Sequence, residues 1–344
     1  MKTQYANAVT QYENGTSLGG RIIKEGGLVV FPTETVYGLG ANGLNSEAVL
    51  KIFAAKGRPA DNPLILHIAK KSELKPLWSH VPDNARILAD TFWPGPLTMI
   101  FNRSSIVPDE VTAGLDTVAV RMPLNKTARA LINAAGVPIA APSANLSGKP
   151  SPTTAEHVRQ DMDGRVDLII DGGPCKYGLE STVVSLIGRP TILRPGAVTK
   201  EMLEAVIGPV EVAHAVLSPL REGETAASPG MKYRHYAPDA EVVVAEGRER
   251  EIAAKICREY DAREAAGEDC IIFATKQTQP FYRGRNCVII GDRTEPATLC
   301  ASLFYSLREY GGRADVIFAE ALPNDDMGLA YMNRLLRSAG FNII

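Results

Sequence analysis

Two loops of this sequence carry cations and hydroxyl groups at a spacing that suits phosphate chemistry. Lys56 and Arg58 stand two residues apart across Gly57, at the end of a predicted helix. Two cations at this spacing can grip a polyphosphate through charge-assisted hydrogen bonds. Residues 142–151, PSANLSGKPS, supply hydroxyl and amide groups that can bind phosphate oxygens. The alternatives are that Lys56 only stabilises a helix C-terminus and that 142–151 is an ordinary turn.

Further polar loops follow other apolar runs. Residues 32–40, PTETVYGLG, contain two threonines, a carboxylate and a tyrosine, while 178–182 and 194–196 add a hydroxyl and a guanidinium. Ligands of open α/β sheets bind at the carboxyl ends of strands, so these loops predict one shared polar site. In 231–236, MKYRHY, cations alternate with aromatics that could stack on a nucleotide, although a tether packed on its domain has the same composition.

Other catalytic patterns are disfavoured. Residues 38–43, GLGANG, match G-x-G-x-x-G, but the preceding strand is predicted to end at Pro32 and the next helix to begin at Ser46. A dinucleotide turn needs the glycines directly between strand and helix, so NAD binding is not expected. The sequence contains no P-loop, H-E-x-x-H or G-x-S-x-G motif. Its five cysteines form no C-x-x-C pair, which predicts reduced, mostly buried thiols and no cysteine zinc site.

Alternating strands and helices must position these loops. Apolar β-branched runs predict strands at 28–31, 64–68, 97–101, 118–122, 137–141, 168–170 and 182–187. Helical patterns occur at 46–56, with Ser46 as N-cap, and at 83–92, 126–135, 154–162 and 200–207. This order predicts an α/β domain with a mixed sheet over residues 1–208.

A linker and a second, smaller domain are predicted after residue 208. Residues 209–239 are rich in Gly, Pro, Ser and Glu and cannot hold a long helix or strand. Strands are then predicted at 241–245, 270–274, 287–290 and 315–319, and helices at 248–266, 296–310 and 329–338. This alternation predicts a Rossmann-like, doubly wound domain over 240–344, in which no polar constellation suggests catalysis.

Composition and charge exclude several classes of protein. With 45% apolar residues the chain is neither disordered nor fibrous. Lys and Arg total 37 against 39 for Asp and Glu, so bulk charge gives no long-range attraction to nucleic acid or an anionic membrane. Up to residue 210 there are 21 basic and 19 acidic residues, which leaves a basic site to local clustering. No apolar leader or membrane span is evident, so a cytoplasmic protein without membrane contact is expected.

The order of the motifs P-T-E-T-V-Y-G-L, K-x-R-P, W-P-G-P-L-T, S-A-N-x-S-G, S-T-V and R-P-G closely resembles the threonylcarbamoyl-AMP synthases. The match covers about residues 15–207, and the following S-P-G-M-K-Y-R-H-Y-A-P segment and domain resemble the longer, two-domain form. The resemblance implies a YrdC-like mixed, twisted sheet with helices. It also implies synthesis of L-threonylcarbamoyl-AMP and pyrophosphate from L-threonine, bicarbonate or CO2, and ATP with Mg²⁺. The product would then serve the machinery that modifies tRNA with threonylcarbamoyladenosine.

The resemblance also assigns roles to residues of this sequence. Lys56 and Arg58 are expected to be catalytic and to hold the ATP phosphates. The other residues expected around ATP are Asn62, Thr117, Ser143, Asn145, Ser151, Arg194 and Tyr233. L-Threonine is expected to contact Thr35, His67, Arg121 and Ser181. Without the resemblance, His67 in its apolar strand would be interpreted as a core histidine. Tyr233 is expected to act as a gate within a linker that covers the nucleotide, and no side chain is assigned to a resident metal.

Two alternatives remain at this point. YrdC-like domains resemble RNA binders with a concave basic face, but the small charge excess predicts weak RNA binding at most. A carbamoyl-phosphate-linked transferase of hydrogenase maturation shares the YrdC-like domain, but it would need zinc-finger and acylphosphatase regions that this sequence does not show. Release of pyrophosphate that depends on threonine and bicarbonate would favour the synthase.

Overall fold

The structure is a computed structural model that describes residues 2–8, 10, 12–218 and 235–344. The described residues form two compact units. The first contains residues up to 218 except Gly148–Pro150, and the second contains those three residues together with 235–344. Each unit has its own apolar core.

A mixed sheet runs through the first unit, as predicted. Its strands are β1 (Gln4–Asn7), β2 (Val29–Phe31), β3 (Gly38–Asn42), β4 (Ile65–His67), β5 (Leu97–Asn102), β6 (Thr117–Arg121), β7 (Ile139–Ala140), β8 (Leu168–Asp171), β9 (Thr182–Ser185), β10 (Thr191–Arg194) and β11 (Glu211–Val212). Across the described residues their order is β1-β8-β2-β3-β7-β4-β6-β5-β9-β10-β11. β4 and β6 are parallel neighbours, whereas β5 and β6 are antiparallel.

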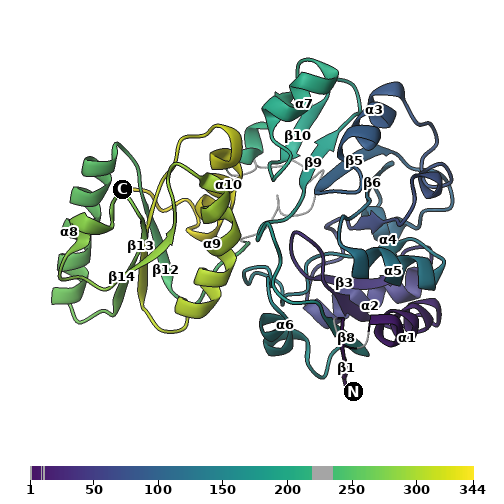
Figure 1. Cartoon of the computed structure of the whole chain (residues 1–344), viewed down its shortest axis with the longest axis horizontal. Helices are drawn as coiled ribbons and strands as arrows, with labels where there is room; N and C mark the ends of the chain where they lie inside the picture. The colour runs from purple at the N-terminus through teal and green to yellow at the C-terminus, as the bar shows by residue number, and fades with distance from the viewer. Residues whose placement is uncertain (1, 9, 11, 219–234) are drawn as a thin grey trace. The chain divides into compact units, whose positions relative to one another are not determined.

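Helices cover both faces of this sheet (Figure 1). They are α1 (Tyr12–Lys24), α2 (Ser46–Lys56), α3 (Asp83–Phe92), α4 (Asp109–Thr112), α5 (Lys126–Ala135), α6 (Ala155–Met162) and α7 (Lys200–Ile207), with short 3-10 helices η1 (Lys71–Leu74) and η2 (His214–Val216). Val30 of β2 packs in a cluster with residues of α2 and α3, whereas Val29 and Phe31 pack with residues of α1 and α5. Neighbouring side chains of a strand point to opposite faces, which explains the two clusters.

The start of α2 corrects one prediction. Asn45, not Ser46, is the N-cap, because the Asn45 side chain accepts a hydrogen bond from the backbone N–H of Ala48 at 3.0 Å. Ser46 is the first helical residue, and its hydroxyl donates to Glu110 instead. Asn caps a helix as well as Ser does, so the local pattern allowed either residue. The helix ends where Gly57 adopts a left-handed backbone with φ of 60°.

The G-x-G-x-x-G match lies in a strand. Gly38 and Gly40 belong to β3, which pairs antiparallel with β2, so they lie inside a strand and not in the turn between a strand and a helix, where a dinucleotide motif needs them. A Cβ atom at Gly40 would lie 2.7 Å from Ile139 and 2.8 Å from Phe31. These glycines therefore serve close packing. β3 itself was not predicted, and neither were β1, α1, α4, β10 and β11, the last of which lies within the predicted linker and pairs with β10.

The second unit is built on a parallel sheet, as predicted for a doubly wound domain. Its strands are β12 (Glu241–Ala245), β13 (Cys270–Thr275), β14 (Cys287–Gly291) and β15 (Val316–Glu320), in the order β12-β15-β13-β14. The helices are α8 (Glu249–Ala265), α9 (Pro296–Tyr310) and α10 (Asp326–Ser338), with the short 3-10 helix η3 (Gln279–Tyr282). α8 covers one face and α9 and α10 the other (Figure 1). α10 begins three residues before the predicted Leu329.

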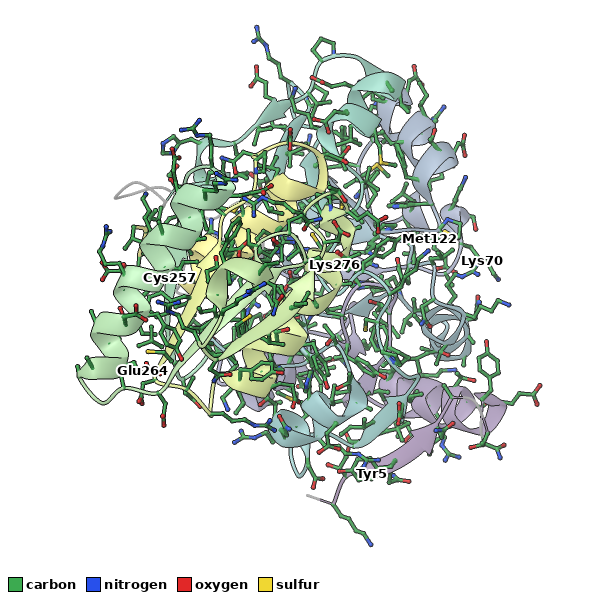
Figure 2. All side chains as sticks on the ribbon, turned by 60° about the vertical axis from the view of Figure 1, so that its left-hand side comes forward. Tyr5, Lys70, Met122, Cys257, Glu264 and Lys276 are labelled. Atoms are coloured by element: carbon green, nitrogen blue, oxygen red, sulfur yellow. The ribbon has the colours of Figure 1, made fainter. Side chains whose placement is uncertain are left out.

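The five cysteines are all free thiols. Cys270 and Cys300 are buried, but Cys175, Cys257 and Cys287 are only half-buried, so the prediction of mostly buried thiols is wrong for three of them. Cys257 and Glu264 both lie on α8 (Figure 2). No helix among the described residues is long and apolar enough to cross a membrane.

Candidate active site

Lys56 joins the two motifs in which phosphate binding is predicted. It is the last residue of α2 and is 2% exposed. Its ammonium donates hydrogen bonds to the main-chain oxygens of Ser143 and Asn145, in the loop after β7. A buried ammonium is costly unless it is well hydrogen-bonded, and these carbonyls provide that partnership. The K-x-R and S-x-N motifs, 87 residues apart in sequence, therefore lie side by side.

The loop that carries Ser143 and Asn145 is itself held by β3 and by Tyr37, the residue before it. Ala144 donates its N–H to the carbonyl oxygen of Tyr37 at 2.8 Å, and Leu39 donates to Pro142 at 2.9 Å. The Ser143 hydroxyl donates to Oδ1 of Asn145 at 2.5 Å. Two side-chain oxygens thus stand together on the two residues whose main-chain oxygens bind Lys56, in an arrangement suited to a phosphate or to a hard cation carried by one.

Arg58 and Asn62 form the other side of the K-x-R motif. The Arg58 guanidinium donates to the main-chain oxygens of Asn62 and Pro63, each at 3.3 Å, which folds the loop after α2. Asn62 is 1% exposed, and its side-chain amide has no hydrogen-bond partner among the described residues. Buried polar groups are nearly always paired, so an unpaired amide beside Arg58 marks a place for a polar ligand.

The residues predicted to contact threonine also lie together. Arg121, whose side chain is 4% exposed, donates to Oγ1 of Thr35 at 2.9 Å and to Glu34 at 2.6 Å. His67 and Arg121 are direct partners in the register of β4 and β6. On the other side, Thr98 is the register partner of Arg121 in β5, and its hydroxyl lies 2.7 Å from that of Ser181. The four predicted residues therefore form one connected neighbourhood.

Burial keeps His67 uncharged. Its side chain lies in β4, with Nδ1 3.2 Å from the carbonyl oxygen of Ile65 and its ring edge-on to Phe31. Burial, followed by the positive charge of Arg121, lowers the pKa of His67 to about 3. The imidazole is consequently neutral at pH 7 and can offer one donor and one acceptor nitrogen.

Arg194 and Ser151 extend the site. The Arg194 guanidinium donates to the main-chain oxygen of Ser181 at 3.0 Å and to its hydroxyl at 3.2 Å. Ser151 is fully buried, and its hydroxyl donates to Glu180, the residue just before Ser181, at 2.5 Å. Both residues are thereby linked to the loop that leads into β9.

One predicted residue is not brought into this neighbourhood, and the structure does not describe another. Thr117 begins β6, whereas Arg121 ends it, so the two Cα atoms are about 13 Å apart at the usual rise of a strand. Tyr233 lies outside the described residues, as does most of the linker predicted to act as a lid. Both assignments stay predictions.

The motif 32–40 contains a residue that sequence reasoning noticed only as a carboxylate. Glu34 is 6% exposed and lies between Thr33 and Thr35. Burial raises the pKa of its carboxyl, but the charge of Arg121 and several hydrogen bonds outweigh burial and leave that pKa below its ordinary value. Glu34 is therefore ionised at neutral pH. Its position directly before Thr35 was the available signal.

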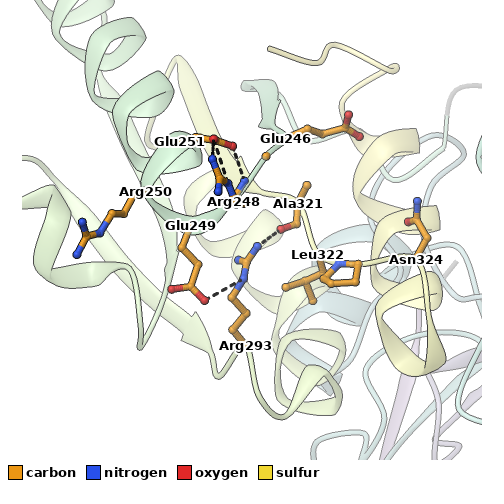
Figure 3. Close-up of a pocket in the computed structure, with 11 residues that line it drawn as sticks. Glu246, Arg248, Glu249, Arg250, Glu251, Arg293, Ala321, Leu322 and Asn324 are labelled. Atoms are coloured by element: carbon orange, nitrogen blue, oxygen red, sulfur yellow. Dashed lines mark hydrogen bonds and ion pairs between the residues drawn. The ribbon is translucent and has the colours of Figure 1, made fainter.

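The second unit contains a pocket of about 850 Å³ after β12 and β15, where an open α/β sheet commonly binds ligands (Figure 3). Two of its three arginines are engaged by acidic residues: Arg248 pairs with Glu251 at 2.6 Å, and Arg293 lies 3.8 Å from Glu249. These two glutamates occupy the first turn of α8 and already complement its dipole. The pocket is therefore poorly suited to a phosphate.

Arg293 also belongs to a buried network that sequence reasoning missed. Glu320, 1% exposed at the end of β15, lies 3.1 Å from the Arg293 guanidinium. The same carboxylate accepts hydrogen bonds from Thr275, Thr278 and Tyr282. With these partners the carboxylate is enclosed, which indicates a structural role.

Comparison with known proteins identifies the family of this chain. A family model described as "Telomere recombination" matches residues 21–196, and one described as "Threonylcarbamoyl-AMP synthase, C-terminal domain" matches 198–340. The threonylcarbamoyl-AMP synthase of Bacillus subtilis is 47% identical over 94% of this chain and 92% of its own length. That of Pyrococcus abyssi is also 47% identical, over 94% of this chain and 93% of its own.

A solved structure carries the likeness to three dimensions. P. abyssi Sua5 complexed with L-threonine is 44% identical to this chain, covers 100% of it and 99% of its own chain, and has a TM-score of 0.93. The two-unit α/β fold is thus shared with the Sua5 proteins. With matches of this identity along nearly its whole length, the chain belongs to the threonylcarbamoyl-AMP synthase family of nucleotidyl-transferring enzymes.

Proposed function

We propose that this protein makes L-threonylcarbamoyl-AMP and pyrophosphate from L-threonine, bicarbonate or CO2, and ATP, and that the product is used to modify tRNA. The observation that carries the proposal is the buried Lys56 ammonium, which joins the K-x-R and S-x-N motifs into one cationic, hydroxyl-rich site. The family of the chain and the L-threonine complex of the P. abyssi protein support the choice of substrate.

The reaction is an adenylation of a carbamate. The threonine amine adds to CO2 and loses a proton, and an oxygen of the resulting carbamate attacks the α-phosphorus of ATP. The bond between the α-phosphorus and the bridging oxygen breaks, and pyrophosphate carries away the electron pair. Negative charge gathers on phosphate oxygens, so Lys56 and Arg58 lower the barrier by electrostatic stabilisation. This chemistry requires no nucleophile from the protein.

The threonine is bound beside the ATP. The cationic Arg121, together with Ser181, receives its carboxylate, while Thr35 and neutral His67 contact its hydroxyl and amine. A neutral imidazole suits this position because a charged one would repel the ammonium form of the substrate and would also face Arg121.

Mg²⁺ accompanies the ATP in this proposal. Mg²⁺ usually keeps several waters and binds through substrate phosphates with one or two protein oxygens, a demand that the side-chain oxygens of Ser143 and Asn145 fit. Among the described residues no group of three or more His, Cys, Asp or Glu side chains could hold a metal by itself. The ion, when bound, neutralises charge on the phosphates.

Product analysis tests the proposal. The purified full chain is incubated with ATP, L-threonine, MgCl2 and ¹³C-bicarbonate, and the products are identified by mass spectrometry. We expect pyrophosphate and a threonylcarbamoyl-AMP that contains one ¹³C atom, with none formed when threonine or bicarbonate is omitted. Pyrophosphate release that is independent of both substrates would contradict the proposal. Weak RNA binding and transfer to a tRNA-modifying machinery stay predictions beside it.

A further inference from the structure

The Arg121 guanidinium is held at each of its three nitrogens. Nε donates to the carbonyl oxygen of Gly95 at 3.3 Å, Nη1 to the Thr35 hydroxyl at 2.9 Å and Nη2 to Glu34 at 2.6 Å. Gly95 is fixed in turn, because its N–H donates to Met122 at 2.8 Å. A guanidinium is planar, so three anchors of this kind fix both its position and its plane.

These contacts leave a matched pair of donors. A guanidinium has five N–H groups, and the contacts given for Arg121 among the described residues use three of them. One N–H then remains on each terminal nitrogen. One N–H from each terminal nitrogen can bind the two oxygens of a carboxylate, which is a bidentate geometry that Arg prefers.

Glu34 is the only charged side chain among these three anchors. The side chain of Glu34 is 5% exposed and that of Arg121 is 4% exposed, so bulk water screens neither charge effectively. Its second oxygen accepts the N–H of Asn125 at 3.3 Å, just before α5, so the carboxylate is held from two sides. Without Glu34, the buried guanidinium would lose its counter-charge and would turn toward other acceptors.

We propose that Glu34 is a positioning residue for substrate binding: its carboxylate holds the Arg121 guanidinium so that one N–H of each terminal nitrogen faces the carboxylate of L-threonine. This inference rests on the proposed function, in which Arg121 receives that carboxylate. Glu34 itself touches no substrate. It acts through Arg121, and with Thr35 it makes the P-T-E-T segment a template for the orientation of the guanidinium.

Steady-state kinetics of the full chain test the inference. Glu34→Ala removes both anchoring oxygens, whereas Glu34→Gln keeps the volume and one acceptor oxygen. For Glu34→Ala we expect KM for threonine to rise about tenfold or more, the order expected from losing one charged hydrogen bond. KM for ATP should stay unchanged and kcat within about threefold, and Glu34→Gln should recover part of the threonine affinity.

A matched pair in the second unit supplies the control. Glu320 and Arg293 form another buried Glu–Arg pair, and Glu320→Gln should lower stability without changing KM for threonine. Arg121→Gln separates the inference from the proposed function. If Arg121→Gln leaves KM for threonine unchanged, the proposed threonine site is wrong. If Arg121→Gln raises KM for threonine but a folded Glu34→Ala protein does not, only the positioning role of Glu34 is wrong.

Two other results would overturn the positioning role of Glu34. A lower KM for threonine in Glu34→Gln would mean that Glu34 repels the substrate and would overturn the inference. A fall in kcat together with equal rises in KM for threonine and KM for ATP would assign Glu34 to stability alone. The same conclusion would follow if circular dichroism showed that neither Glu34 variant folds.

Discussion

At the scale of single residues, the two cations of the K-x-R motif should both be needed for turnover but should differ in their contribution to stability. Lys56→Ala or Arg58→Ala should lower turnover by ~100-fold or more, because loss of one donor to a developing charge costs about 3 kcal/mol. Lys56→Ala also leaves the main-chain oxygens of Ser143 and Asn145 without their ammonium, so it should cost more stability than Arg58→Ala.

Turnover and thermal denaturation of both variants measure the two effects. Lys70→Ala, which removes an exposed lysine of the same unit, is the control for loss of charge. Near-normal product formation by either K-x-R variant would remove that residue from the mechanism.

His67 makes a prediction about pH. Its pKa is about 3 in the folded protein against 6.5 in a model compound, so between these values the unfolded chain binds more protons than the folded one. The free energy of unfolding therefore rises with pH across this window and falls as the pH drops below about 6.5. His67→Asn should flatten that dependence between pH 7 and pH 5 in urea titrations. Parallel curves for the two proteins would show that His67 does not contribute.

At the scale of elements, α1 and α5 approach closely through a glycine. A Cβ atom at Gly20 would lie 2.5 Å from Cβ of Ala134 in α5. Helix propensity alone predicts that Gly20→Ala stabilises α1 by about 1 kcal/mol. We expect instead a loss of about 1–3 kcal/mol, because the added methyl overpacks the contact.

Urea titrations of Gly20→Ala measure this loss. Asn14→Ala at an exposed position of the same helix is the matched control and should be neutral or slightly stabilising. A more stable Gly20→Ala protein would contradict the close approach of α1 and α5.

The same glycines explain what the sequence could not reveal. α5 begins and ends at the predicted residues because Asn125 caps its start and Gly136 its end, and both signals are local. α1 contains Gly15, Gly19 and Gly20, whose low helix propensity hides the helix from a local pattern. These glycines allow close contacts with residues outside α1. Local patterns do not contain such tertiary demands.

Some residues of the candidate site could likewise be predicted from local motifs, and others could not. The ordered motifs were enough to select Lys56 and Ser143, which the structure brings together. The role of Glu34 was not readable, because its partner Arg121 lies 87 residues further along the chain. The two residues meet only through a side-chain ion pair of the folded chain.

At the scale of the whole molecule, the two units have separate apolar cores, which predicts that damage to one core stays local. Glu320→Gln leaves the Arg293 guanidinium without its buried counter-charge, so it should destabilise the second unit. Hydrogen exchange followed by mass spectrometry should show faster exchange in peptides of β13 and β15, with unchanged exchange in β4 and β6. Faster exchange in both units would contradict independent cores.

The order β1-β8-β2 has a consequence for synthesis on the ribosome. β1 and β2 are complete within the first 31 residues, yet both pair with β8, which ends at Asp171. During translation β1 therefore has unpaired backbone donors and acceptors until β8 has left the ribosomal exit tunnel. Unpaired strand edges attract other chains, so the nascent first unit is a natural client for chaperones that shield strand edges. Slowing translation ahead of β8 would prolong that exposure and should lower the yield of folded enzyme.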